Sequence, residues 1–352
     1  MKILVTGAAG FIGHFVTRAL LERGDEVVGF DSINEYYDPE LKYHRLAALG
    51  IPEADIPSVP SLQAVRSGSF IFYRNLLEDH EAVSAVFKAH RFDCVIHLAA
   101  QAGVRYSIDN PRAYMKANLD GFLNILEACR EQAVPHLAYA SSSSVYGMNR
   151  KVPFSEKDGV DHPVSLYAAT KRANELMAHS WSNMYGLPTT GMRFFTVYGP
   201  MGRPDMAYFK FADAIRTGKP VDIYNNGELW RDFTYIDDVV KAVLLIADRP
   251  PAGDAQFDPE HPCVDTSSAP WRVYNIGNSS PVKLSEFISV LEESLGCEAL
   301  KRFAPMQAGD VYMTAADTAS LERIFNWKPC TAISEGLMKF AHWYKEYTSW
   351  QQ

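Results

Sequence analysis

The 352-residue sequence lacks the features that mark several other classes of protein. Its net charge of −8 includes no long basic run, so nothing indicates a surface for nucleic acid or for an anionic membrane. The longest apolar runs, such as residues 242–247, fall far short of the roughly twenty residues that a membrane-spanning helix needs. The first residues run directly into ILVTG, without the pattern of a secretion signal. We therefore expect a cytoplasmic protein that binds neither nucleic acid nor membrane.

Cysteine is also scarce, which limits the covalent and metal chemistry that the chain can carry. The five cysteines are scattered, odd in number and free of CxxC or CxxH spacing: Cys94, Cys129, Cys263, Cys297 and Cys330. This pattern argues against a disulfide framework and against a zinc site, and we expect no metal. What the chain does have is a hydrophobic content of 47%, enough to bury a core in one large domain or two coupled lobes.

Short β-branched runs alternate with amphipathic helical segments through the first two hundred residues. This alternation is typical of an α/β fold with a doubly wound parallel (Rossmann) sheet. We expect strands in KILVTG, EVVGFD, FIFYRN, CVIHLAA, HLAYASS and TTGMRFF, and helices in HFVTRALLERG, EAVSAVFKAH and GFLNILEACREQ. Residues 51–69 and 250–270 are rich in proline and unpatterned, so we expect loops there.

After residue 199 the order of strands and helices becomes irregular. We therefore expect two domains, a Rossmann domain over residues 1–198 and a smaller, discontinuous, mixed α/β lobe over residues 199–352. Segments around 233–248 and 272–277 should return to the first domain.

Three glycines follow the first apolar strand and open a helix with the spacing GxxGxxG. Lacking a Cβ, Gly7 can form the tight turn, Gly10 lets the main chain approach a pyrophosphate, and Gly13 lets the helix pack closely on the strand. A turn with a purely structural purpose is the alternative. The next strand ends in Asp31, eighteen residues after the third glycine, where an acid would meet the adenosine ribose and repel a 2′-phosphate. The pattern predicts NAD as the cofactor.

Other candidates for cofactor contacts stand at or near strand ends. Ala99 and Ala100 are small enough to let the cofactor approach the main chain, although small residues also serve ordinary packing. Asn34 is a weaker candidate for the adenosine end. The predicted cofactor-binding residues are Gly7, Gly10, Phe11, Ile12, Gly13, Asp31, Asn34, Asn75, Leu76, Leu98, Ala99, Ala100, Gln101, Tyr167 and Lys171.

Tyr167 and Lys171 stand four residues apart in SLYAATKRANEL, and residues four apart share one face of a helix. A phenol with its ordinary pKa near 10 is too rarely ionised to act as a base at neutral pH. A lysine cation and the positive nicotinamide of an oxidised cofactor would both stabilise the phenolate. Such pairs are common and mostly inert on helices, so this one is informative only because a dinucleotide motif precedes it.

Four serines, residues 141–144, follow an apolar strand at the carboxyl edge of the predicted sheet, where ligands bind in this fold class. Their hydroxyls could share the proton that Tyr167 removes, and a solvated turn is the alternative. His97 lies within a predicted strand, and we expect it to satisfy its neighbours rather than to act in catalysis.

These motifs together resemble the extended short-chain dehydrogenases. The segments TGAAGFIG, HLAAQAGV, SSSSVYG, YAATK and RFFTVYGP, with Asp31, are similar to those of the nucleotide-sugar epimerases and dehydratases over nearly the whole chain. MGRPDMAYFKF and YNNGELWRDFTYIDDV most resemble the UDP-glucuronate 4-epimerases. The resemblance implies NAD held by residues 1–198, nucleotide sugar held by residues 199–352, and a catalytic set of Ser142, Tyr167 and Lys171. It also implies a homodimer, formed through GFLNILEACREQ and the helix that carries the tyrosine.

Two departures from the family pattern refine this reading. Relatives usually have Asp-Leu at the end of the third strand, where this chain has Asn75-Leu76, and an amide can still hydrogen-bond adenine. The 4,6-dehydratases carry an Asp-Glu pair just before VYG, and UDP-glucuronate decarboxylases commonly place a glutamate there, whereas this chain has Ser143 and Ser144. Without these acids elimination loses its catalyst, and epimerisation remains.

The implied reaction inverts carbon 4 of UDP-glucuronate to give UDP-galacturonate through a transient 4-keto sugar. That ketone is a β-keto acid, so the site should hold the carboxylate to prevent loss of carbon dioxide, with Ser143, Ser144 and Arg203 as donors. The resemblance assigns the diphosphate to Arg231, whose guanidinium suits phosphate. The predicted substrate-binding residues are Ser142, Ser143, Ser144, Thr196, Arg203, Arg231, Gln307 and Asp310.

Several alternatives stay open. The chain could be a 4-epimerase of a neutral UDP-sugar, a UDP-glucuronate decarboxylase or 4,6-dehydratase of the same fold, or, in a different class, a non-catalytic NAD-binding regulator. The serines argue against the dehydratase, and the Tyr167 and Lys171 pair argues against a regulator, which would need neither residue. The choice between a carboxylate and a hydroxymethyl group on the substrate rests on the resemblance and the serine and arginine donors alone.

Overall fold

The computed structural model describes residues 1–306 and 312–350, which form two compact units. The first unit comprises Met1–Arg150, Glu156–Phe194 and Val240–Asn275, and the second comprises Lys151–Ser155, Phe195–Val239 and Ile276–Gln352. Each unit is therefore assembled from segments that are far apart in the sequence.

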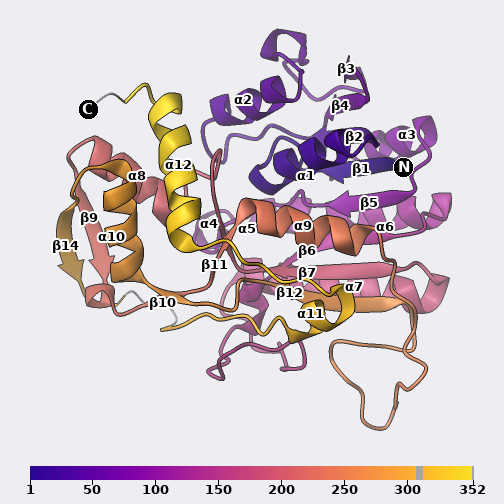
Figure 1. The fold of residues 1–352 in the computed structure, drawn as a ribbon. Coiled ribbons are helices and arrows are strands. Elements are labelled where there is room, and N and C mark those ends of the chain that lie inside the picture. The colour runs from indigo at the N-terminus through magenta and orange to yellow at the C-terminus, as the bar shows by residue number, and fades with distance from the viewer. Residues whose placement is uncertain (307–311, 351–352) are drawn as a thin grey trace. The chain divides into compact units, whose positions relative to one another are not determined.

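Within the described residues, an eight-stranded sheet with the order β12-β7-β6-β5-β1-β2-β4-β3 forms the frame of the first unit (Figure 1). Its strands are β1 (Lys2–Thr6), β2 (Glu26–Asp31), β3 (Val65–Ser67), β4 (Phe70–Arg74), β5 (Cys94–His97), β6 (Leu137–Ser142), β7 (Thr189–Phe194) and β12 (Trp271–Ile276). The pairings from β4 through β2, β1, β5 and β6 to β7 are all parallel. The predicted parallel α/β sheet is confirmed.

One part of the predicted loop over residues 51–69 is instead regular structure. Val65–Ser67 forms β3, which pairs antiparallel with β4. The strand was missed because it is only three residues long, and the turn that makes the pairing possible depends on Gly68, at a φ of +55°. A short 3-10 helix, Glu53–Asp55, stands earlier in the same segment.

Helices follow the strands of the first unit in the alternation that the sequence predicts. They are α1 (Phe11–Glu22), α2 (Glu40–Ala48), α3 (His80–Ala89), α4 (Tyr106–Asp109), α5 (Pro111–Tyr114), the π-helix η2 (Met115–Asp120), α6 (Gly121–Gln132), the 3-10 helix η3 (Ser143–Tyr146) and α7 (Leu166–Tyr185). A further helix, α9 (Ile236–Ala247), contains residues of both units. Asp79 and Ser165 cap α3 and α7 through their side chains. Gly24, shortly after the end of α1, adopts a φ of +91°, as glycines that end helices commonly do.

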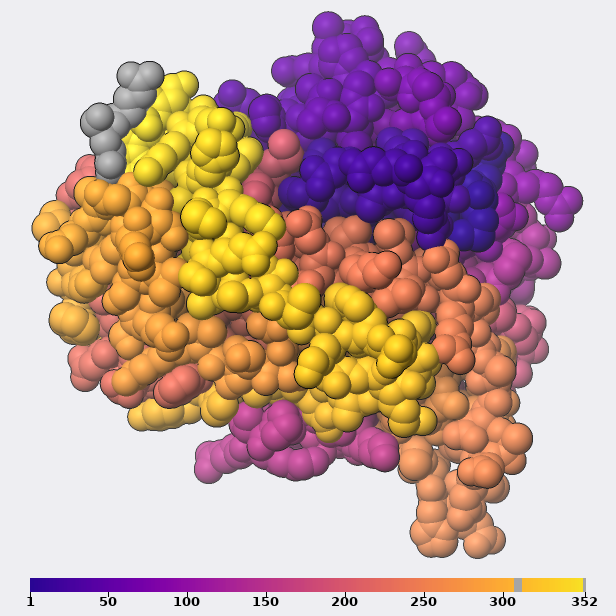
Figure 2. Space-filling model, in the orientation of Figure 1, coloured from indigo at the N-terminus to yellow at the C-terminus, as the bar shows by residue number. Residues whose placement is uncertain are grey.

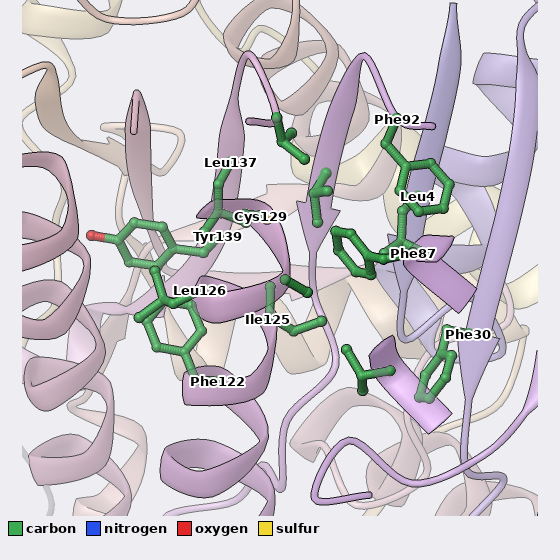
Figure 3. Close-up of a cluster of buried hydrophobic side chains, with 14 of the residues drawn as sticks. Leu4, Phe30, Phe87, Phe92, Phe122, Ile125, Leu126, Cys129, Leu137 and Tyr139 are labelled. Atoms are coloured by element: carbon green, nitrogen blue, oxygen red, sulfur yellow. The ribbon is translucent and has the colours of Figure 1, made fainter. Parts of the chain in front are cut away.

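The face of the sheet covered by α3, α6 and α7 carries a hydrophobic core of the first unit (Figure 3). Leu4 and Phe30 project from strands, Phe87 from α3, and Phe122 and Ile125 from α6. All five are at most 5% exposed, and burying a side chain of this size stabilises the fold by roughly 1.5–3 kcal/mol. This core fixes the helices against the strands whose ends carry the candidate site.

The second unit is a mixed α/β lobe, as predicted. Its strands are β8 (Thr196–Tyr198), β9 (Pro220–Tyr224), β10 (Trp230–Arg231), β11 (Phe233–Tyr235), β13 (Val282–Lys283) and β14 (Leu300–Ala304), and its helices are α8 (Ala207–Arg216), η4 (Asn225–Gly227), α10 (Leu284–Leu295), α11 (Ala319–Phe325) and α12 (Ile333–Tyr347). The strands pair two by two, β8 with β11 and β9 with β14 in parallel, and β10 with β13 antiparallel. Aromatic packing joins strands to helices, as where Phe233 stacks on Phe287 with ring centroids 4.2 Å apart.

The predicted loop over residues 250–270 projects from the first unit, as the orange extension in Figure 2 shows. It contains bends and turns but no helix. Among the described residues, no helix combines the length and the apolar character needed to cross a lipid bilayer.

Candidate active site

The glycine loop between β1 and α1 forms a cradle that side chains would fill. Gly7 has a φ of +77°, and a Cβ on it would stand 2.8 Å from the main-chain nitrogen of Ala99. A Cβ on Gly13 would stand 2.0 Å from the carbonyl oxygen of Gly7, so α1 can lie this close to the loop only with glycine there. Gly10 forms the N-cap of this twelve-residue helix and has no side chain to cap it. The first-turn N–H groups and the helix dipole therefore suit a pyrophosphate.

Asp31, at the end of β2, lies directly beneath this cradle and is 8% exposed. One carboxylate oxygen accepts a hydrogen bond from the Ala9 N–H at 3.1 Å, and the other accepts from the Ile33 N–H at 2.8 Å. Ile33 adopts a φ of +51°, an unusual conformation for a β-branched residue. The acid thus braces the glycine loop from below, and its remaining lone pairs suit ribose hydroxyls.

Asn34 reaches toward a buried lysine that sequence reasoning missed. The Lys42 ammonium, on α2 and 5% exposed, donates to the side-chain oxygen of Asn34 at 2.7 Å and to its carbonyl oxygen at 2.6 Å. Nothing in the local pattern marked this lysine, because its partner lies eight residues earlier in an irregular segment.

Most of the other predicted cofactor residues lie at strand ends of the same sheet, and Phe11 and Ile12 lie on α1. Asn75, at the end of β4, is buried, and its side-chain oxygen accepts from the neighbouring Leu76 N–H at 2.8 Å. The Ala99 N–H donates to the Thr6 hydroxyl at 3.2 Å, which draws the end of β5 toward the glycine loop. Phe11 lies buried at the start of α1, followed by the partly exposed Ile12, and Leu98 and Ala100 are also partly exposed.

Strand β6 ends at Ser142, whose hydroxyl is a local centre of hydrogen bonds. Its oxygen accepts from the Ser144 N–H at 3.2 Å and from the Ser144 hydroxyl at 2.9 Å. Ser143 and Ser144 begin the 3-10 helix η3, and all three serines are partly exposed. The end of the strand therefore carries partly exposed hydroxyl groups that could hydrogen-bond a ligand.

Helix α7 begins beside this strand and carries Tyr167 and Lys171 on one face. The Lys171 ammonium is 2% exposed and donates to the Ala140 carbonyl oxygen at 2.9 Å, two residues before Ser142 on β6. The Tyr167 ring meets the buried Tyr114 ring edge to face, with centroids 6.1 Å apart. The structure thus brings the predicted tyrosine helix and serine strand together through the lysine.

Burial sets the ionisation of the lysine. Desolvation lowers the pKa of Lys171 from 10.5 to about 8, so the ammonium still carries its proton at neutral pH. A cation in a poorly solvated setting acts strongly on its neighbours and would stabilise a phenolate one helical turn away.

One further turn along the same helix lies a buried ion pair that sequence reasoning missed. Glu175 and Arg193 are both 0% exposed, and the guanidinium donates to the two carboxylate oxygens at 2.8 and 2.9 Å. The Ser141 hydroxyl donates to the same carboxylate at 2.6 Å. Burial alone would raise the pKa of Glu175, but Arg193 and this hydrogen bond hold that pKa below its usual value. The pair ties α7 to β6 and β7 beneath the serines.

Asn118 is a second residue that sequence reasoning missed. It lies in the π-helix η2, and its side chain both accepts from the Gln101 N–H at 2.7 Å and donates to the Gln101 carbonyl at 3.0 Å. It also donates to the Thr170 hydroxyl at 3.1 Å. A predicted cofactor residue is thus tied to the turn of α7 between the tyrosine and the lysine. In the sequence, the only sign of this role was an amide side chain at a position that the helical pattern predicts to be buried.

His97 is buried, and its Nδ1 lies 2.9 Å from the Thr6 hydroxyl, as expected for a histidine that satisfies its neighbours. Burial and the nearby Lys171 lower the pKa of His97 to about 3, so its ring is neutral at physiological pH. Among the residues that the structure describes, no group of three or more His, Cys, Asp or Glu side chains is arranged to hold a metal ion.

The predicted substrate residues that the structure describes, apart from the serines, belong to the second unit. Thr196 opens β8 and donates its N–H to the Asp232 carbonyl at 3.2 Å. Arg203 forms a forked pair with Asp205, at 3.0 and 2.6 Å. Arg231 lies in β10 and donates to the Trp230 carbonyl at 2.9 Å. Gln307 and Asp310 lie outside the described residues.

Comparison with known proteins identifies the family. Residues 3–277 match the model of the NAD dependent epimerase/dehydratase family. The chain is 52% identical to an uncharacterized 37.6 kDa protein of Escherichia coli O111:H-, over 99% of each chain. It is 46% identical to a probable UDP-glucuronate 4-epimerase of Rhizobium meliloti, over 98% of this chain and 97% of that protein.

A solved structure is similar over the same extent. The UDP-glucuronic acid 4-epimerase of Bacillus cereus, in complex with UDP-glucuronic acid and NAD, superposes with a TM-score of 0.83 at 30% identity, covering 99% of this chain and 100% of the other. The family match agrees with the glycine cradle, the acid at the end of β2 and the tyrosine helix. The chain belongs to the NAD dependent epimerase/dehydratase family.

Proposed function

We propose that this protein is a UDP-glucuronate 4-epimerase that uses NAD and produces UDP-galacturonate. The observation that carries the proposal is the similarity, over essentially the full length of both chains, to proteins named as UDP-glucuronate 4-epimerases. The site agrees with this reaction, because β6 ends at Ser142 and is followed by Ser143 and Ser144, without a carboxylic acid that could drive elimination.

Tyr167 is the proposed base. It removes the proton from the 4-hydroxyl of the sugar, while the Ser142 hydroxyl shares a hydrogen bond with the same oxygen. Lys171, buried and fixed by the Ala140 carbonyl, supplies the positive charge that favours the phenolate. NAD, when bound, supplies reversible removal of a hydride from carbon 4. After the ketone has presented its other face, Tyr167 returns its proton to the new hydroxyl.

Inversion requires the sugar ring to turn while the rest of the substrate stays bound. We propose that Arg231 binds the diphosphate and that Thr196 lies next to the sugar. Gln307 and Asp310 are the proposed contacts of the nucleotide ribose. Under this assignment residues 199–352 grip the nucleotide, and residues 1–198, with their returning segments, carry NAD and the reacting groups.

The carboxylate has to be held because the ketone is a β-keto acid. Ser143 and Ser144 offer hydroxyl donors for it, and the Ser144 hydroxyl already points to its neighbour Ser142. Arg203 is the proposed cation, and Asp205 keeps its guanidinium oriented in the structure. The substrate carboxylate would bind this arginine beside Asp205 or in its place.

NAD fits the first unit on the geometry of the cradle. The glycine turn and the first turn of α1 would hold the pyrophosphate, and Asp31 would accept from the adenosine ribose while repelling a 2′-phosphate. Asn34, Asn75 and Leu76 would flank the adenosine. The segment Leu98–Gln101, together with Phe11, Ile12, Tyr167 and Lys171, would complete the cofactor site.

We further propose a cytoplasmic homodimer. Helix α7 exposes Leu176, Met184 and Tyr185 by 53%, 57% and 48%, which supports an apolar contact between two copies of this helix. The five cysteines are free, which suits a reducing compartment.

A proton NMR time course of the purified protein with UDP-glucuronate and no added cofactor tests the proposal. We expect the anomeric signal of UDP-galacturonate to grow to a constant ratio, with heat-denatured protein as the control. Conversion to a UDP-pentose would identify a decarboxylase instead. Conversion of UDP-glucose but not of UDP-glucuronate would identify a neutral-sugar epimerase and overturn the proposed substrate.

A further inference from the structure

Asp232 is a fully buried carboxylate in the second unit, directly after Arg231 in the sequence. One of its oxygens accepts from the Asn278 N–H at 2.7 Å. The other accepts from the Ala316 N–H at 2.7 Å and from the Ser279 N–H at 3.1 Å. A single side chain therefore holds the main chain of two segments that are 46 and 84 residues away.

The main chain of Asp232 is tied as well. Its N–H donates to the Thr314 hydroxyl at 3.2 Å, and its carbonyl accepts from the Thr196 N–H at 3.2 Å. On the other side of Arg231, the Trp230 N–H donates to the Tyr312 carbonyl at 2.9 Å. The main chain on both sides of Arg231 is thus hydrogen-bonded to β8 and to residues 312–314, in addition to the pairing of β10 with β13.

The two segments held by the carboxylate also pack against each other. A Cβ on Gly277 would stand 2.4 Å from the Cβ of Ala316 and 3.1 Å from the Asp232 carboxylate. Ser279 adopts a φ of +55°, and its hydroxyl donates to the Ala316 carbonyl at 2.8 Å. This dense arrangement leaves no slack for the carboxylate to move without shifting the chain around it.

The chemistry at this position calls for an acid and not for its amide. Three N–H donors converge on the side chain, and an ionised carboxylate is purely an acceptor. Asparagine would keep one oxygen and turn an NH₂ donor toward at least one main-chain N–H. Burial raises the pKa of Asp232, and the three N–H groups oppose that rise.

We propose that Asp232 is a positioning residue of the substrate site, which fixes the main chain of Arg231 and Thr196 so that both face the nucleotide sugar. The inference rests on the proposed function, which assigns the diphosphate to Arg231 and the sugar's surroundings to Thr196. Asp232 itself is buried and does not touch the substrate. Its loss should weaken nucleotide binding and leave the reacting groups of the first unit unchanged.

The chain offers a matched control in the same unit. Asp238 is 8% exposed, and its carboxylate accepts from the N–H groups of Cys330 and Thr331 at 3.3 and 2.9 Å. It is a buried aspartate that holds a distant segment in the same manner, but neither partner is among the predicted substrate residues. Asp238→Asn therefore matches the chemical change of Asp232→Asn away from the site.

The test measures the dissociation constant of UDP by calorimetry, together with KM and kcat for UDP-glucuronate and the amount of bound NAD. For Asp232→Asn we expect the UDP dissociation constant and KM to rise about tenfold or more, since each opposed or lost hydrogen bond to a buried group weakens the site. We expect kcat to stay within about threefold and bound NAD to be unchanged. Asp238→Asn should leave both UDP binding and KM as in the wild type.

A folded Asp232→Asn variant that binds UDP as the wild type does would overturn the inference, and so would an equal loss in Asp238→Asn. Should Asp232→Asn not fold, Thr314→Val removes only the acceptor of the Asp232 N–H and should raise the UDP dissociation constant by a smaller factor. No rise in that variant would also count against the inference.

A double-mutant cycle shows whether Asp232 acts through Arg231. In an Arg231→Met background, Asp232→Asn should add less to the UDP dissociation constant than it adds in the wild type, and strict additivity would refute the coupling. The outcomes separate the two proposals. A wild type that binds UDP but does not convert UDP-glucuronate sinks the proposed function alone, whereas an active wild type with an unaffected Asp232→Asn sinks this inference alone.

Discussion

The two units of the molecule each bury a carboxylate next to residues that we assign to the reaction, and they satisfy it in different ways. In the first unit Glu175 forms a forked ion pair with Arg193. In the second unit Asp232 accepts three main-chain N–H groups. Removing Glu175 would strand a buried cation, whereas removing Asp232 would leave only amide groups unsatisfied. The proposed catalytic helix therefore depends on charge balance, and the proposed substrate segments depend on the register of the main chain.

The two acids should also respond to pH in opposite senses. Burial opposes ionisation of Glu175, but its ion pair with Arg193 holds the pKa below the usual value. Its stabilisation is present above the unfolded-state pKa and is lost as the pH falls through the lower folded-state value. Burial raises the pKa of Asp232, so its stabilisation is present at low pH and is lost as the pH rises through the folded-state value. Of these two acids, only Glu175 should therefore lose its stabilising contribution as the pH falls.

The largest effect that we expect comes from Tyr167→Phe, which should lower kcat by about a thousandfold or more because the proposed base is lost. Steady-state kinetics by NMR, with bound NAD quantified after denaturation, provides the measurement. NAD content and the dissociation constant of UDP should match the wild type. Tyr185→Phe, at the far end of the same helix, is the control and should retain full activity. Epimerisation by Tyr167→Phe at more than a small fraction of the normal rate would remove this tyrosine from the role of base.

Glu175→Gln should then give the largest loss of stability, about 3–5 kcal/mol in the free energy of unfolding, because Arg193 stays buried without its partner. Asp232→Asn should cost less, about 1–3 kcal/mol, because no cation is stranded. Urea unfolding of both variants measures the difference. The double variant Glu175→Gln/Arg193→Met should recover part of the loss. Equal losses in the free energy of unfolding for the two single variants would contradict the proposed difference between the two buried carboxylates.

Lys171→Met should stabilise the fold while it abolishes activity. Burial lowers the pKa of Lys171 from 10.5 to about 8, so at neutral pH the folded state carries the cost of a buried cation. Removing it should raise the free energy of unfolding by about 2 kcal/mol, after allowing for the lost hydrogen bond to Ala140.

The pH dependence of this stability difference follows from proton binding. Between about pH 8 and 10.5 the unfolded state binds the lysine proton and the folded state does not, so the wild type gains stability as the pH rises through this window. The advantage of Lys171→Met should therefore be greatest below pH 8 and shrink toward pH 10.5. Thermal unfolding at pH 7 and pH 10 tests this trend. A variant less stable than the wild type at pH 7 would mean that the hydrogen bond outweighs the burial cost.

The features of the fold that depend on residues close together in the sequence could be predicted from it. The parallel sheet follows from strand and helix alternation, and the cradle follows from glycines whose spacing reflects contacts within one turn, such as Gly13 against the Gly7 carbonyl. The short strand β3 escaped because a three-residue strand has too little periodicity to stand out.

Long-range pairing could not be predicted. Glu175 and Arg193 are eighteen residues apart on different elements, and Asp232 meets Ala316 across 84 residues. A single sequence shows the residue types but not which of them meet, so a buried acid reads like a surface acid until its partners are known. Lys42 and Asn118 escaped for the same reason, since their contacts with Asn34 and Gln101 are set by irregular segments and a π-helix.

The smallest expected effect comes from Ser144→Ala, which tests whether a residue of the first unit binds the substrate without taking part in the reaction. Ser144 lies beside the proposed catalytic residues but is assigned to the substrate carboxylate, and its hydroxyl donates to Ser142 at 2.9 Å. Ser144→Ala should raise KM by about threefold to tenfold, the value of one hydrogen bond, with little change in stability. Because the carboxylate would be less firmly held while the ketone exists, a UDP-pentose by-product should become detectable by NMR. Ser144→Thr, which keeps the hydroxyl, should suppress that by-product, and its formation at the same level in both variants would detach Ser144 from the carboxylate.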